Sequence, residues 1–571
     1  MMSDRSSEPV CPADPPIPCS RWLSCLEEHP DGWPALRTVY SGQTGMVREK
    51  IGLIRRMLDH FLRGFGDLPV RLYRAPGRIN LRGMHIDTHG GWLNLQAHHG
   101  ETLAAAAVTD EPEQHYANLW PGDSAFTFSL RPAADLLAMA GRRHAIHEPD
   151  ALADPALRGL AAGLPDWGRY VAGAALAARF HGVASPDGLR MVVASDLIRG
   201  ASLSSSASLC VTVLLAEWGA AGMTPDSAGL MQAVRQAEWF AGARTGLSDQ
   251  AAIVLARAGS VLHAALGGSD LFSESPRWLP MPENAAVLVI HTFTTHALSG
   301  ARRVDYARNR FAYSVALRML ESAAAARFSR PYVPHFQTFP DVLKAFPDNR
   351  DRLNLIGALP VDLDLSELER LCGTETVREE YGRLFGDLPE PERPTRFAIR
   401  GPILFGLAET LRARRFFEAL ESGDPVRAGQ LMRIGHDGDR VADAAGRSFR
   451  EPVNNRVLRL WLAGNRPLEI LPGHYGASTR ALDRAVDIAL SAGALGACLT
   501  GAGLGGAVLA LCRKADVEEV RARILSGLAS RDFQLARGPE APPWPSDAGR
   551  TAVVENTAVA GAGPIPPPPG A

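Results

Sequence analysis

The sequence predicts a mixed α/β (α+β) fold, because strand-like and helix-like apolar segments follow one another along the chain. The clearest case is the apolar run at residues 189–194, which has the length of a buried strand. It is followed at residues 209–218 by a segment that suits a buried helix. Between them, residues 197–209 are rich in Ser, Gly and Ala. With 571 residues, the chain is long enough for roughly two to four domains with ample buried core.

Both ends of the chain have the composition of disordered segments. Residues 1–20 are rich in Ser, Pro and Asp, and residues 538–571 are rich in Pro, Gly and Ala. Neither stretch carries enough large apolar side chains to form a core, so we expect two disordered tails. The ordered chain then begins with residues 46–65, whose apolar positions recur at helical spacing, and continues with a short strand at residues 68–73.

Composition excludes several classes of function. Lys and Arg number 60 against 62 Asp and Glu, so the chain has no general basic field to attract nucleic acid or an anionic membrane. Its 7 cysteines are scattered, with no Cys-x-x-Cys pair, which argues against a disulfide framework or a zinc ribbon. The sequence shows neither an apolar leader nor a stretch long enough to span a bilayer. We expect a soluble, cytoplasmic protein without nucleic-acid or membrane partners.

The run at residues 197–209 has the chemistry of a phosphate site. Small side chains let backbone N–H groups approach a phosphate, and the N-terminus of the following helix adds its partial positive charge. Serine hydroxyls can donate to phosphate oxygens or ligate Mg²⁺. A serine-rich surface turn has the same composition. The loop on its own therefore leaves both interpretations open.

Three further loops are polar or rich in glycine. Residues 75–91 hold an Arg, a His and an Asp within about ten positions, which suits either a binding site or a solvated loop. Residues 242–250 form a Gly-punctuated turn near whose end lies Asp249, and the plain interpretation of that Asp is a helix N-cap. Residues 500–506 contain closely spaced glycines before an apolar run and predict a tight loop preceding a strand.

In this order and at these separations, the four loops resemble the motifs of the GHMP small-molecule kinases, in their galactokinase-like branch. The loop at 75–91 resembles the sugar-binding signature, and residues 200–209 resemble the phosphate loop. The turn at 242–250 resembles the one that carries the catalytic Asp, and residues 500–506 resemble the third, Gly-rich motif. The resemblance covers most of residues 45–530. It implies a two-domain fold with the active site in the cleft between the domains.

The resemblance also implies where the domains lie. We expect an N-terminal kinase domain at residues 45–280, with the sugar-binding and phosphate-loop motifs, and a C-terminal kinase domain at residues 281–537. Within the second domain, residues 325–395 are charged and interrupted by prolines, which marks an inserted segment. A short helix is expected there at residues 365–371.

The resemblance assigns roles residue by residue. Asp249 would accept or orient the proton of the anomeric hydroxyl, and Arg78 would stabilise the charge between sugar and phosphate while keeping Asp249 ionised. The positions expected to bind the sugar are His85, Asp87, Met84 and Tyr306. The positions expected to bind ATP are Gly200, Ala201, Ser202, Ser204, Ser205, Ser206 and Trp167. Those expected to hold Mg²⁺ are Ser206, with Ser205 as the alternative, and Glu238.

The chain departs from the family at some of these positions. Galactokinases normally carry Glu where this chain has Met84, and that Glu binds the hydroxyl at C6 of the sugar, whereas a thioether offers an apolar wall. Galacturonate and L-arabinose therefore stand beside galactose as candidate substrates, with Arg82 either supplying a cation or pointing to solvent. Glu238 lies four positions before Gly242, one fewer than in the family, which leaves its register for Mg²⁺ open.

The resemblance implies an ATP-dependent sugar 1-kinase. Such an enzyme transfers the γ-phosphoryl group to the anomeric hydroxyl of galactose or a related galactose-configured sugar, with ATP and Mg²⁺ as cofactors. We expect a monomer or a weak dimer. A rival from another class is a non-catalytic galactokinase-like protein that binds sugar and ATP and regulates a partner. Such proteins lose phosphate-loop residues, whereas this chain keeps the Ser-Ser-Ser-Ala core, Arg78 and Asp249.

Overall fold

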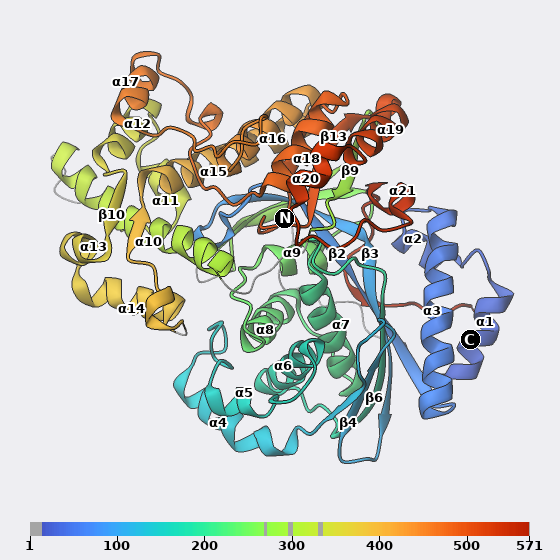
Figure 1. The fold of residues 1–571 in the computed structure, drawn as a ribbon. Coiled ribbons are helices and arrows are strands. Elements are labelled where there is room, and N and C mark those ends of the chain that lie inside the picture. The colour runs from blue at the N-terminus through green and yellow to red at the C-terminus, as the bar shows by residue number, and fades with distance from the viewer. Residues whose placement is uncertain (1–13, 268–270, 295–300, 329–334, 387, 570–571) are drawn as a thin grey trace.

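The computed structural model describes residues 14–267, 271–294, 301–328, 335–386 and 388–569. Within these ranges the chain forms a large sheet, a smaller sheet and a two-stranded one, with helices packed around them (Figure 1). The predicted mixed fold with two domains is confirmed.

The larger sheet contains most of the N-terminal half of the chain. Nine of the described strands join it, in the order β1-β2-β3-β6-β4-β5, with β15 beside β2, and with β7 beside β3 and β8. Paired strands run antiparallel except β4 and β6, which are parallel. The strands are β1 (Ile17–Pro18), β2 (Pro69–Arg82), β3 (Trp92–Thr109), β4 (Gln114–Asn118), β5 (Phe126–Phe128), β6 (Gly188–Ser195), β7 (Ser260–Leu266), β8 (Phe272–Pro280) and β15 (Gly563–Pro564).

Helices cover both faces of this sheet. Successive side chains of a strand point to opposite faces, and on β3 the side chains on both faces are apolar. On β3, Leu103 and Ala105 belong to the core formed with α1 and α3, whereas Ala104 and Ala106 belong to the core formed with α6, α7 and α8. Figure 1 shows the two helical layers on either side of the strands. The helices of this half are α1 (Cys19–Glu28), α2 (Pro34–Val39), α3 (Thr44–Phe65), α4 (Ala134–Arg143), α5 (Pro155–Gly159), α6 (Asp166–Phe180), α7 (Ser205–Ala220), α8 (Ser227–Phe240) and α9 (Ser248–Leu255).

The smaller sheet lies in the C-terminal part of the chain. Its four described strands are antiparallel and follow the order β12-β13-β9-β14. One apolar core joins this sheet to α16, α18, α19 and α20. The elements are β9 (Ala285–His291), β12 (Gly496–Leu499), β13 (Ala507–Arg513), β14 (Val553–Glu555), α16 (Pro425–Asp439), α18 (Arg480–Ser491), α19 (Val517–Leu528), α20 (Arg531–Arg537) and α21 (Ala548–Thr551).

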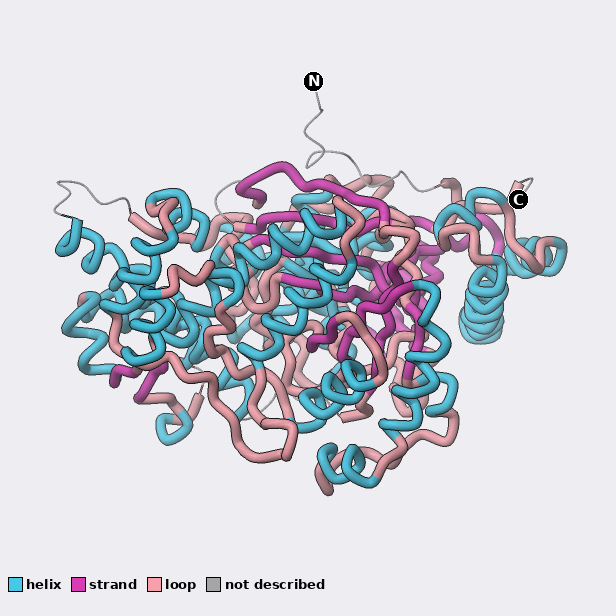
Figure 2. The backbone as a smooth tube through the Cα atoms, turned by 90° about the horizontal axis from the view of Figure 1, so that it is seen from above, coloured by secondary structure: helices cyan, strands magenta, loops and turns pink. Residues whose placement is uncertain are grey.

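The remaining segments form a helical region at one side of the molecule, away from most of the strands (Figure 2). Residues 325–395 were expected to hold one short helix, and they hold several. Two of them, α11 and α13, begin with complete capping boxes, at Thr338 with Asp341 and at Asp364 with Glu367. The elements are α10 (Ala301–Phe328), α11 (Phe339–Ala345), α12 (Asn349–Ala358), β10 (Asp362–Asp364), α13 (Leu365–Cys372), α14 (Thr374–Phe385), β11 (Arg396–Ala398), α15 (Arg400–Glu421) and α17 (Asn455–Ala463).

The prediction of a disordered tail at residues 538–571 is wrong. β14 pairs with the smaller sheet and β15 with the larger one, and the side chains of Val559 and Ile565 are buried. Arg74 Nη1 also donates to the carbonyl oxygens of Ala560, at 2.9 Å, and Gly561, at 2.7 Å. The tail is ordered because its backbone pairs with strands from elsewhere in the chain. Such pairing cannot be predicted from the amino-acid composition of the tail.

The predicted N-terminal tail lies mostly outside the described residues, which begin at residue 14. Its last residues, 17–20, form β1 and the start of α1. In the described ranges, no helix combines the length and the apolar character needed to cross a membrane. The cysteines within the same ranges are free thiols.

Candidate active site

A cavity of about 420 Å³ lies where the four predicted loops meet. Its wall also takes residues from α10. The predicted site residues that line it are Arg78, His85, Asp87, Trp167, Gly200, Ser202, Ser204, Ser205, Ser206, Asp249 and Tyr306. Three predicted residues, Met84, Ala201 and Glu238, lie outside this lining.

The sugar motif turns sharply after strand β2. Gly83 has a left-handed φ of +107°, and a Cβ at this position would lie 2.3 Å from the carbonyl oxygen of Trp92, so glycine is required. His85 follows with a φ of +62°, which is uncommon for a residue with a side chain. The short helix η2 (Asp87–His89) then begins. These turns bring His85 and Asp87 into the cavity wall.

Arg78 and Asp249 form an ion pair in that wall. Arg78 Nε lies 2.8 Å and Nη2 lies 2.7 Å from Oδ1 of Asp249. The other carboxylate oxygen, Oδ2, accepts a hydrogen bond of 2.6 Å from the Ser204 hydroxyl, and Arg78 Nη1 donates to the carbonyl oxygen of Ser202 at 2.6 Å. The phosphate loop therefore holds both members of the pair.

The interpretation of Asp249 as a helix N-cap is wrong. Helix α9 begins at Ser248, its N-cap position is Leu247, and Asp249 lies in the first turn. The carboxylate is instead directed at Arg78 and Ser204. By sequence alone, an Asp at the start of a helix fits both an N-cap and a catalytic carboxylate. The contact with Arg78, which lies 171 positions away in the sequence, decides between the two roles.

The phosphate loop joins β6 to α7 through left-handed backbone positions. Gly200 has φ +69°, Ser202 has φ +57° and Ser204 has φ +61°. Ser202 and Ser204 carry side chains in this sparsely populated region, which other contacts must hold in place. Helix α7 begins directly afterwards, at Ser205. Its first backbone N–H groups have no partner within the helix, and such groups suit an anion.

The Gly-rich loop at residues 500–506 packs directly on the phosphate loop. The Ser202 hydroxyl donates to the carbonyl oxygen of Gly505 at 3.1 Å. A Cβ on Gly501 would lie 3.0 Å from Nη2 of Arg78, and one on Gly506 would lie 2.6 Å from the carbonyl carbon of Ala201. Side chains at these glycines would therefore separate the two loops.

Glu238 lies against the phosphate loop, although the sequence left its register open. Its Oε1 accepts a hydrogen bond of 2.9 Å from the Ser206 hydroxyl. Its Oε2 accepts from the Thr245 hydroxyl at 3.1 Å and from Nε2 of Gln250 at 2.5 Å. Burial, and after it the neighbouring carboxylate of Asp249, raise the pKa of Glu238 to about 8.

The residues around Glu238 fit a divalent cation. A hydroxyl oxygen and a carboxylate oxygen are the hard ligands that Mg²⁺ prefers. The three hydrogen-bond donors to Glu238 are neutral groups, and a raised pKa marks a carboxylate that a nearby cation would return to its ionised form.

His85 is held by aromatic and acidic neighbours. Its ring stacks on Tyr475 with centroids 4.3 Å apart, and Tyr306 of α10 meets it edge-on at 6.1 Å. Nε2 of His85 lies 3.3 Å from Oδ1 of Asp439, at the end of α16. Asp439 and Tyr475 were not predicted, because no motif in the sequence marks them.

Asp87 packs on the turn that carries Asp249. Its Oδ2 accepts from the backbone N–H of Ser248 at 3.3 Å. A Cβ on Gly246 would lie 2.0 Å from the same oxygen. The sugar motif and the turn before α9 are thus in direct contact.

The prediction that Met84 walls the sugar is wrong. Its side chain is 1% exposed and belongs to the core that contains the smaller sheet. Gly83 and His85 line the cavity, and Met84 between them turns away from it. Arg82 neither points to solvent nor enters the cavity wall, since it is fully buried and paired with Glu409 of α15.

Three family models match the chain in the order of its motifs. The galactokinase galactose-binding signature matches residues 59–108, which contain the sugar motif. The GHMP kinases N terminal domain matches residues 169–257, which contain the phosphate loop and the Asp249 turn. The GHMP kinases C terminal model matches residues 454–529, which contain the Gly-rich loop.

The chain belongs to the GHMP kinases, in their galactokinase-like branch. It is therefore a sugar kinase, a phosphotransferase with an alcohol group as acceptor and with ATP as the phosphate donor.

Curated relatives of this galactokinase-like kinase cover most of its length. A galactokinase of Chloroflexus aggregans is 27% identical over 481 residues, which is 82% of this chain and 91% of the relative. A galactokinase of Streptomyces coelicolor is 26% identical over 493 residues, covering 85% of this chain and 95% of the relative. Among solved structures, the galactokinase of Lactococcus lactis complexed with galactose has a TM-score of 0.56 at 17% identity, covering 89% of this chain and 98% of that one. That similarity shows the fold.

The wall of this kinase also takes residues from outside the sugar motif and the Asp249 turn. Trp167, expected among the ATP-binding positions, donates from its Nε1 to the carbonyl oxygen of Ser124 at 3.2 Å. In the same wall, the Arg199 guanidinium lies 4.7 Å from the ring centroid of Trp120. Arg310 of α10 also lines the cavity, and burial lowers the pKa of its guanidinium. Trp120 and Arg199 were not predicted as site residues; Arg199 lies near the start of the run at 197–209, whereas Trp120 lies outside the four loops and only the fold brings it to the wall.

Proposed function

We propose that this kinase transfers the γ-phosphoryl group of ATP to the anomeric hydroxyl of galactose or of a closely related galactose-configured sugar. Two findings support the sugar: the galactose-binding signature matches residues 59–108, and the relatives that cover most of the chain are named galactokinase.

The observation that carries the proposal is the Arg78–Asp249 pair. It contacts the phosphate loop through Ser202 and Ser204, and the sugar motif reaches the same turn through Asp87. Phosphoryl transfer depends mainly on positioning and on stabilising charge that spreads over the phosphate oxygens. Asp249 would accept or orient the proton of the sugar hydroxyl, and Arg78 would stabilise the charge that forms beside it.

The phosphate loop would hold ATP through the backbone N–H groups at the start of α7 and the hydroxyls of Ser204, Ser205 and Ser206. Ser206 and Glu238 would hold Mg²⁺. When bound, that ion neutralises charge on the phosphate oxygens.

His85 and Asp87 would bind sugar hydroxyls, and the substituent at C6 separates the candidate sugars. Met84 lies in the core outside the cavity lining and so does not contact C6, and L-arabinose, which has no C6 hydroxyl, stays a candidate. Arg244 and Arg310 line the cavity, and a uronate carboxylate pairs well with an arginine side chain. We rank galactose first, on the relatives, and galacturonate second, on these arginines.

An ADP-release assay with ATP and Mg²⁺ tests the proposal. The sugars compared are galactose, galacturonate, L-arabinose, glucose and N-acetylgalactosamine, and ³¹P NMR locates the phosphate on the product. We expect the highest kcat/KM with galactose or galacturonate and a phosphate at C1. Preference for glucose, or a phosphate elsewhere, would contradict the proposal. Binding of sugar and ATP without ADP release would favour the non-catalytic regulatory protein.

A further inference from the structure

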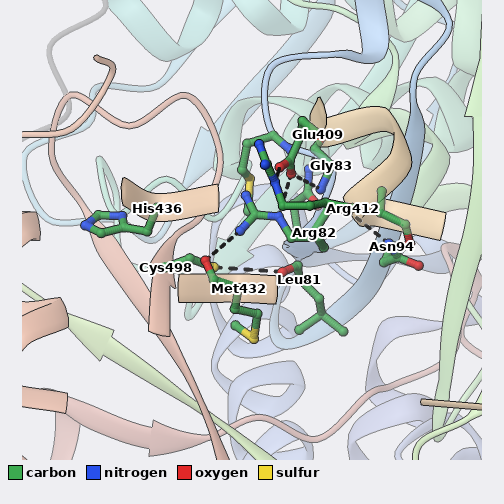
Figure 3. Close-up of polar contacts among 12 residues, drawn as sticks. Leu81, Arg82, Gly83, Asn94, Glu409, Arg412, Met432, His436 and Cys498 are labelled. Atoms are coloured by element: carbon green, nitrogen blue, oxygen red, sulfur yellow. Dashed lines mark hydrogen bonds and ion pairs between the residues drawn. The ribbon is translucent and has the colours of Figure 1, made fainter. Parts of the chain in front are cut away.

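A buried carboxylate lies directly behind the sugar motif. Glu409, on helix α15, is fully buried, and its Oε1 accepts hydrogen bonds from the backbone N–H groups of Gly83 at 2.7 Å and Met84 at 3.1 Å. The same oxygen accepts from Nε of Arg82 at 2.5 Å. Figure 3 shows the Glu409 carboxylate between the Arg82 side chain and the turn at Gly83. One oxygen of the C-terminal part therefore binds three consecutive residues of the motif.

The second oxygen of Glu409 anchors the carboxylate to its own helix. Nε of Arg412 donates to Oε2 at 2.8 Å, and Nη1 of Arg412 donates to the carbonyl oxygen of Leu471 at 2.7 Å. Arg82 in turn donates to the carbonyl oxygen of Met432, in α16, at 2.9 Å (Figure 3). The triad Arg82–Glu409–Arg412 thus connects the sugar motif to α15 and α16 through fully buried groups.

The segment that Glu409 binds is the one that needs support. Gly83 and His85 both adopt left-handed backbone, and His85 does so with a side chain, which persists only where the surroundings impose it. Two adjacent N–H groups directed at one carboxylate fix the peptide planes on either side of Gly83, which precede Met84 and His85. That orientation puts Met84 into the core and His85 into the cavity wall.

The triad is a costly way to gain stability alone. Three charged groups without solvent contact pay a large desolvation penalty, and well-packed apolar side chains often serve stability as well or better. Burial acts to raise the pKa of Glu409, but Arg82 and Arg412 outweigh it and the pKa is lowered, so the carboxylate stays ionised. A buried ionised group that binds two backbone N–H groups is suited to fixing a conformation.

We propose that Glu409 is a positioning residue for the sugar site, acting through the Gly83–Met84 turn to hold His85 in the cavity wall. It does not touch the cavity itself. The inference rests on the proposed function, since His85 is placed there at the sugar end. It assigns the C-terminal part of the chain a role in sugar affinity that none of the four motifs contains.

Two single variants of the full-length enzyme separate positioning from stability. Glu409→Gln removes the charged acceptor of the Gly83 and Met84 N–H groups, whereas Arg412→Gln disrupts the same triad and leaves Oε1 on the turn. Glu409→Gln leaves two buried guanidinium groups without a counter-charge, and Arg412→Gln leaves Oε2 of Glu409 without its donor, so we expect both variants to lower the melting temperature. Glu409→Gln should raise the KM for the sugar about tenfold or more, with the KM for ATP near wild type. Arg412→Gln should leave both KM values near wild type.

A triple variant covers the case in which Glu409→Gln does not fold. Replacing Arg82 by Met, Glu409 by Leu and Arg412 by Met removes all three charges together, a change that buried triads often tolerate. We expect a melting temperature near wild type, a raised sugar KM and faster hydrogen exchange in the peptide that contains Gly83 and Met84. A folded triple variant with wild-type sugar KM and unchanged exchange would overturn the proposal, as would equal sugar KM values in the two single variants.

The exchange measurement does not depend on turnover. If no tested sugar is phosphorylated by the wild-type enzyme, the proposed function fails. Exchange at the Gly83–Met84 turn in Glu409→Gln against Arg412→Gln still shows whether Glu409 holds that turn, and equal exchange in both would overturn the inference.

Discussion

Asp249 illustrates how single contacts prepare the site for chemistry. Each of its carboxylate oxygens accepts from a different partner, Oδ1 from Arg78 and Oδ2 from Ser204. A carboxylate has about four lone-pair sites, so acceptor capacity remains for a sugar hydroxyl after both contacts are made. The side chain is 16% exposed, and Asp249 belongs to the cavity wall. Asp249 can therefore meet a substrate while Arg78 and Ser204 keep its orientation.

Asp249→Asn tests whether the Asp249 carboxylate accepts the proton of the sugar hydroxyl. The amide keeps the size of the side chain but cannot accept a proton, so we expect kcat to fall by about 10²–10⁴-fold, the range of a general base. The KM values for sugar and ATP should stay near wild type, because the wall keeps its shape. Ser248→Ala is a suitable control, since the Ser248 hydroxyl lies at the long distance of 3.4 Å from Asp249. An Asp249→Asn enzyme with undiminished kcat would remove this residue from the mechanism.

Glu238→Gln tests the metal site. We expect the Mg²⁺ concentration at half-maximal velocity to rise by roughly ten- to a hundredfold, because an amide oxygen is a weaker ligand than a carboxylate. The melting temperature should change little, since a carboxyl group with a pKa of about 8 is mostly neutral at pH 7 without a cation. Thr245→Val, which removes another hydrogen-bond donor to Glu238, serves as the control and should leave the Mg²⁺ requirement near wild type. A Mg²⁺ titration that is unchanged in Glu238→Gln would contradict this assignment.

At the scale of elements, the site depends on turns that fit closely against one another. The first turn of α9 carries Asp249 and also supports Asp87 of the sugar motif through the backbone N–H of Ser248. Gly246 lies where the two segments touch. Sugar contacts and the catalytic carboxylate therefore share one short segment.

Gly246→Ala should displace Asp87 without disturbing the fold. The new Cβ would lie 2.0 Å from Oδ2 of Asp87, and the end of that side chain can move at little cost. We expect the sugar KM to rise by about tenfold or more, the result of a misplaced binding group, while the melting temperature stays near wild type. Gly64→Ala in α3, where a Cβ meets nothing within 4 Å, is the matched control for both readouts. A sugar KM unchanged in Gly246→Ala would mean that Asp87 does not bind the sugar.

Sequence patterns predicted the elements that have a regular apolar period. Residues 46–65 are helical in α3, residues 189–194 are extended in β6, and the expected helix at 365–371 is α13. Prediction failed where the backbone departs from a regular period. β2 continues past residue 73 to Arg82 through a polar, Gly-rich sequence, because its register shifts let the strand keep its pairing with β3.

The same reasoning explains the outcome for the site. Site residues that lie within a recognised motif, such as Arg78 and Ser204, could be predicted from the sequence. The direction of the Met84 side chain could not, because it follows from two left-handed positions beside it and from a carboxylate more than three hundred residues away. The sequence did not predict that Arg82 and Glu409 form a buried pair, since charged residues usually lie at the surface.

At the scale of the whole molecule, the C-terminal tail connects the two main sheets. β14 extends the smaller sheet beside β9, and β15 adds to the larger sheet beside β2. Between them, the carbonyl oxygen of Ala558 accepts from the Ser41 hydroxyl at 2.6 Å. Val553, Val559 and Ile565 of the tail are buried, so it contributes to the fold although its composition is that of a linker.

A chain ending at residue 556 should be markedly less stable. It loses the buried side chains of Val559 and Ile565, each contributing about 1.5–3 kcal/mol, and the carbonyl acceptors of the buried Arg74. We expect a clear fall in melting temperature by calorimetry. A chain ending at Pro567 keeps β15 and both apolar side chains and should melt like the full chain. Equal melting of all three chains would show that the tail is dispensable.

Buried histidines should make the folded protein sensitive to mild acid. Burial lowers the pKa of His89 and His263 to about 3 and of His99 and His291 to about 4, and lowers that of His98 well below its ordinary value. These groups stay neutral in the folded state while the unfolded chain takes up protons below about pH 6.5, the ordinary pKa of histidine. Their contribution to stability is therefore complete above pH 6.5 and is lost as the pH falls from 6.5 to about 3–4, where the folded-state pKa values of these rings lie.

In that window, each of these histidines lowers the free energy of unfolding by up to about 1.4 kcal/mol for each pH unit that the pH falls. Glu217 and Glu238 oppose the trend, since burial raises their pKa values to about 7 and about 8, so that both favour the folded state as the pH falls. The histidines outnumber them, and the net free energy of unfolding should fall from pH 6.5 to pH 5. Melting temperature against pH measures this slope. His291→Asn removes one titrating ring and should make the slope shallower, whereas a melting temperature that is flat over this range would show that these rings are protonated in the folded state.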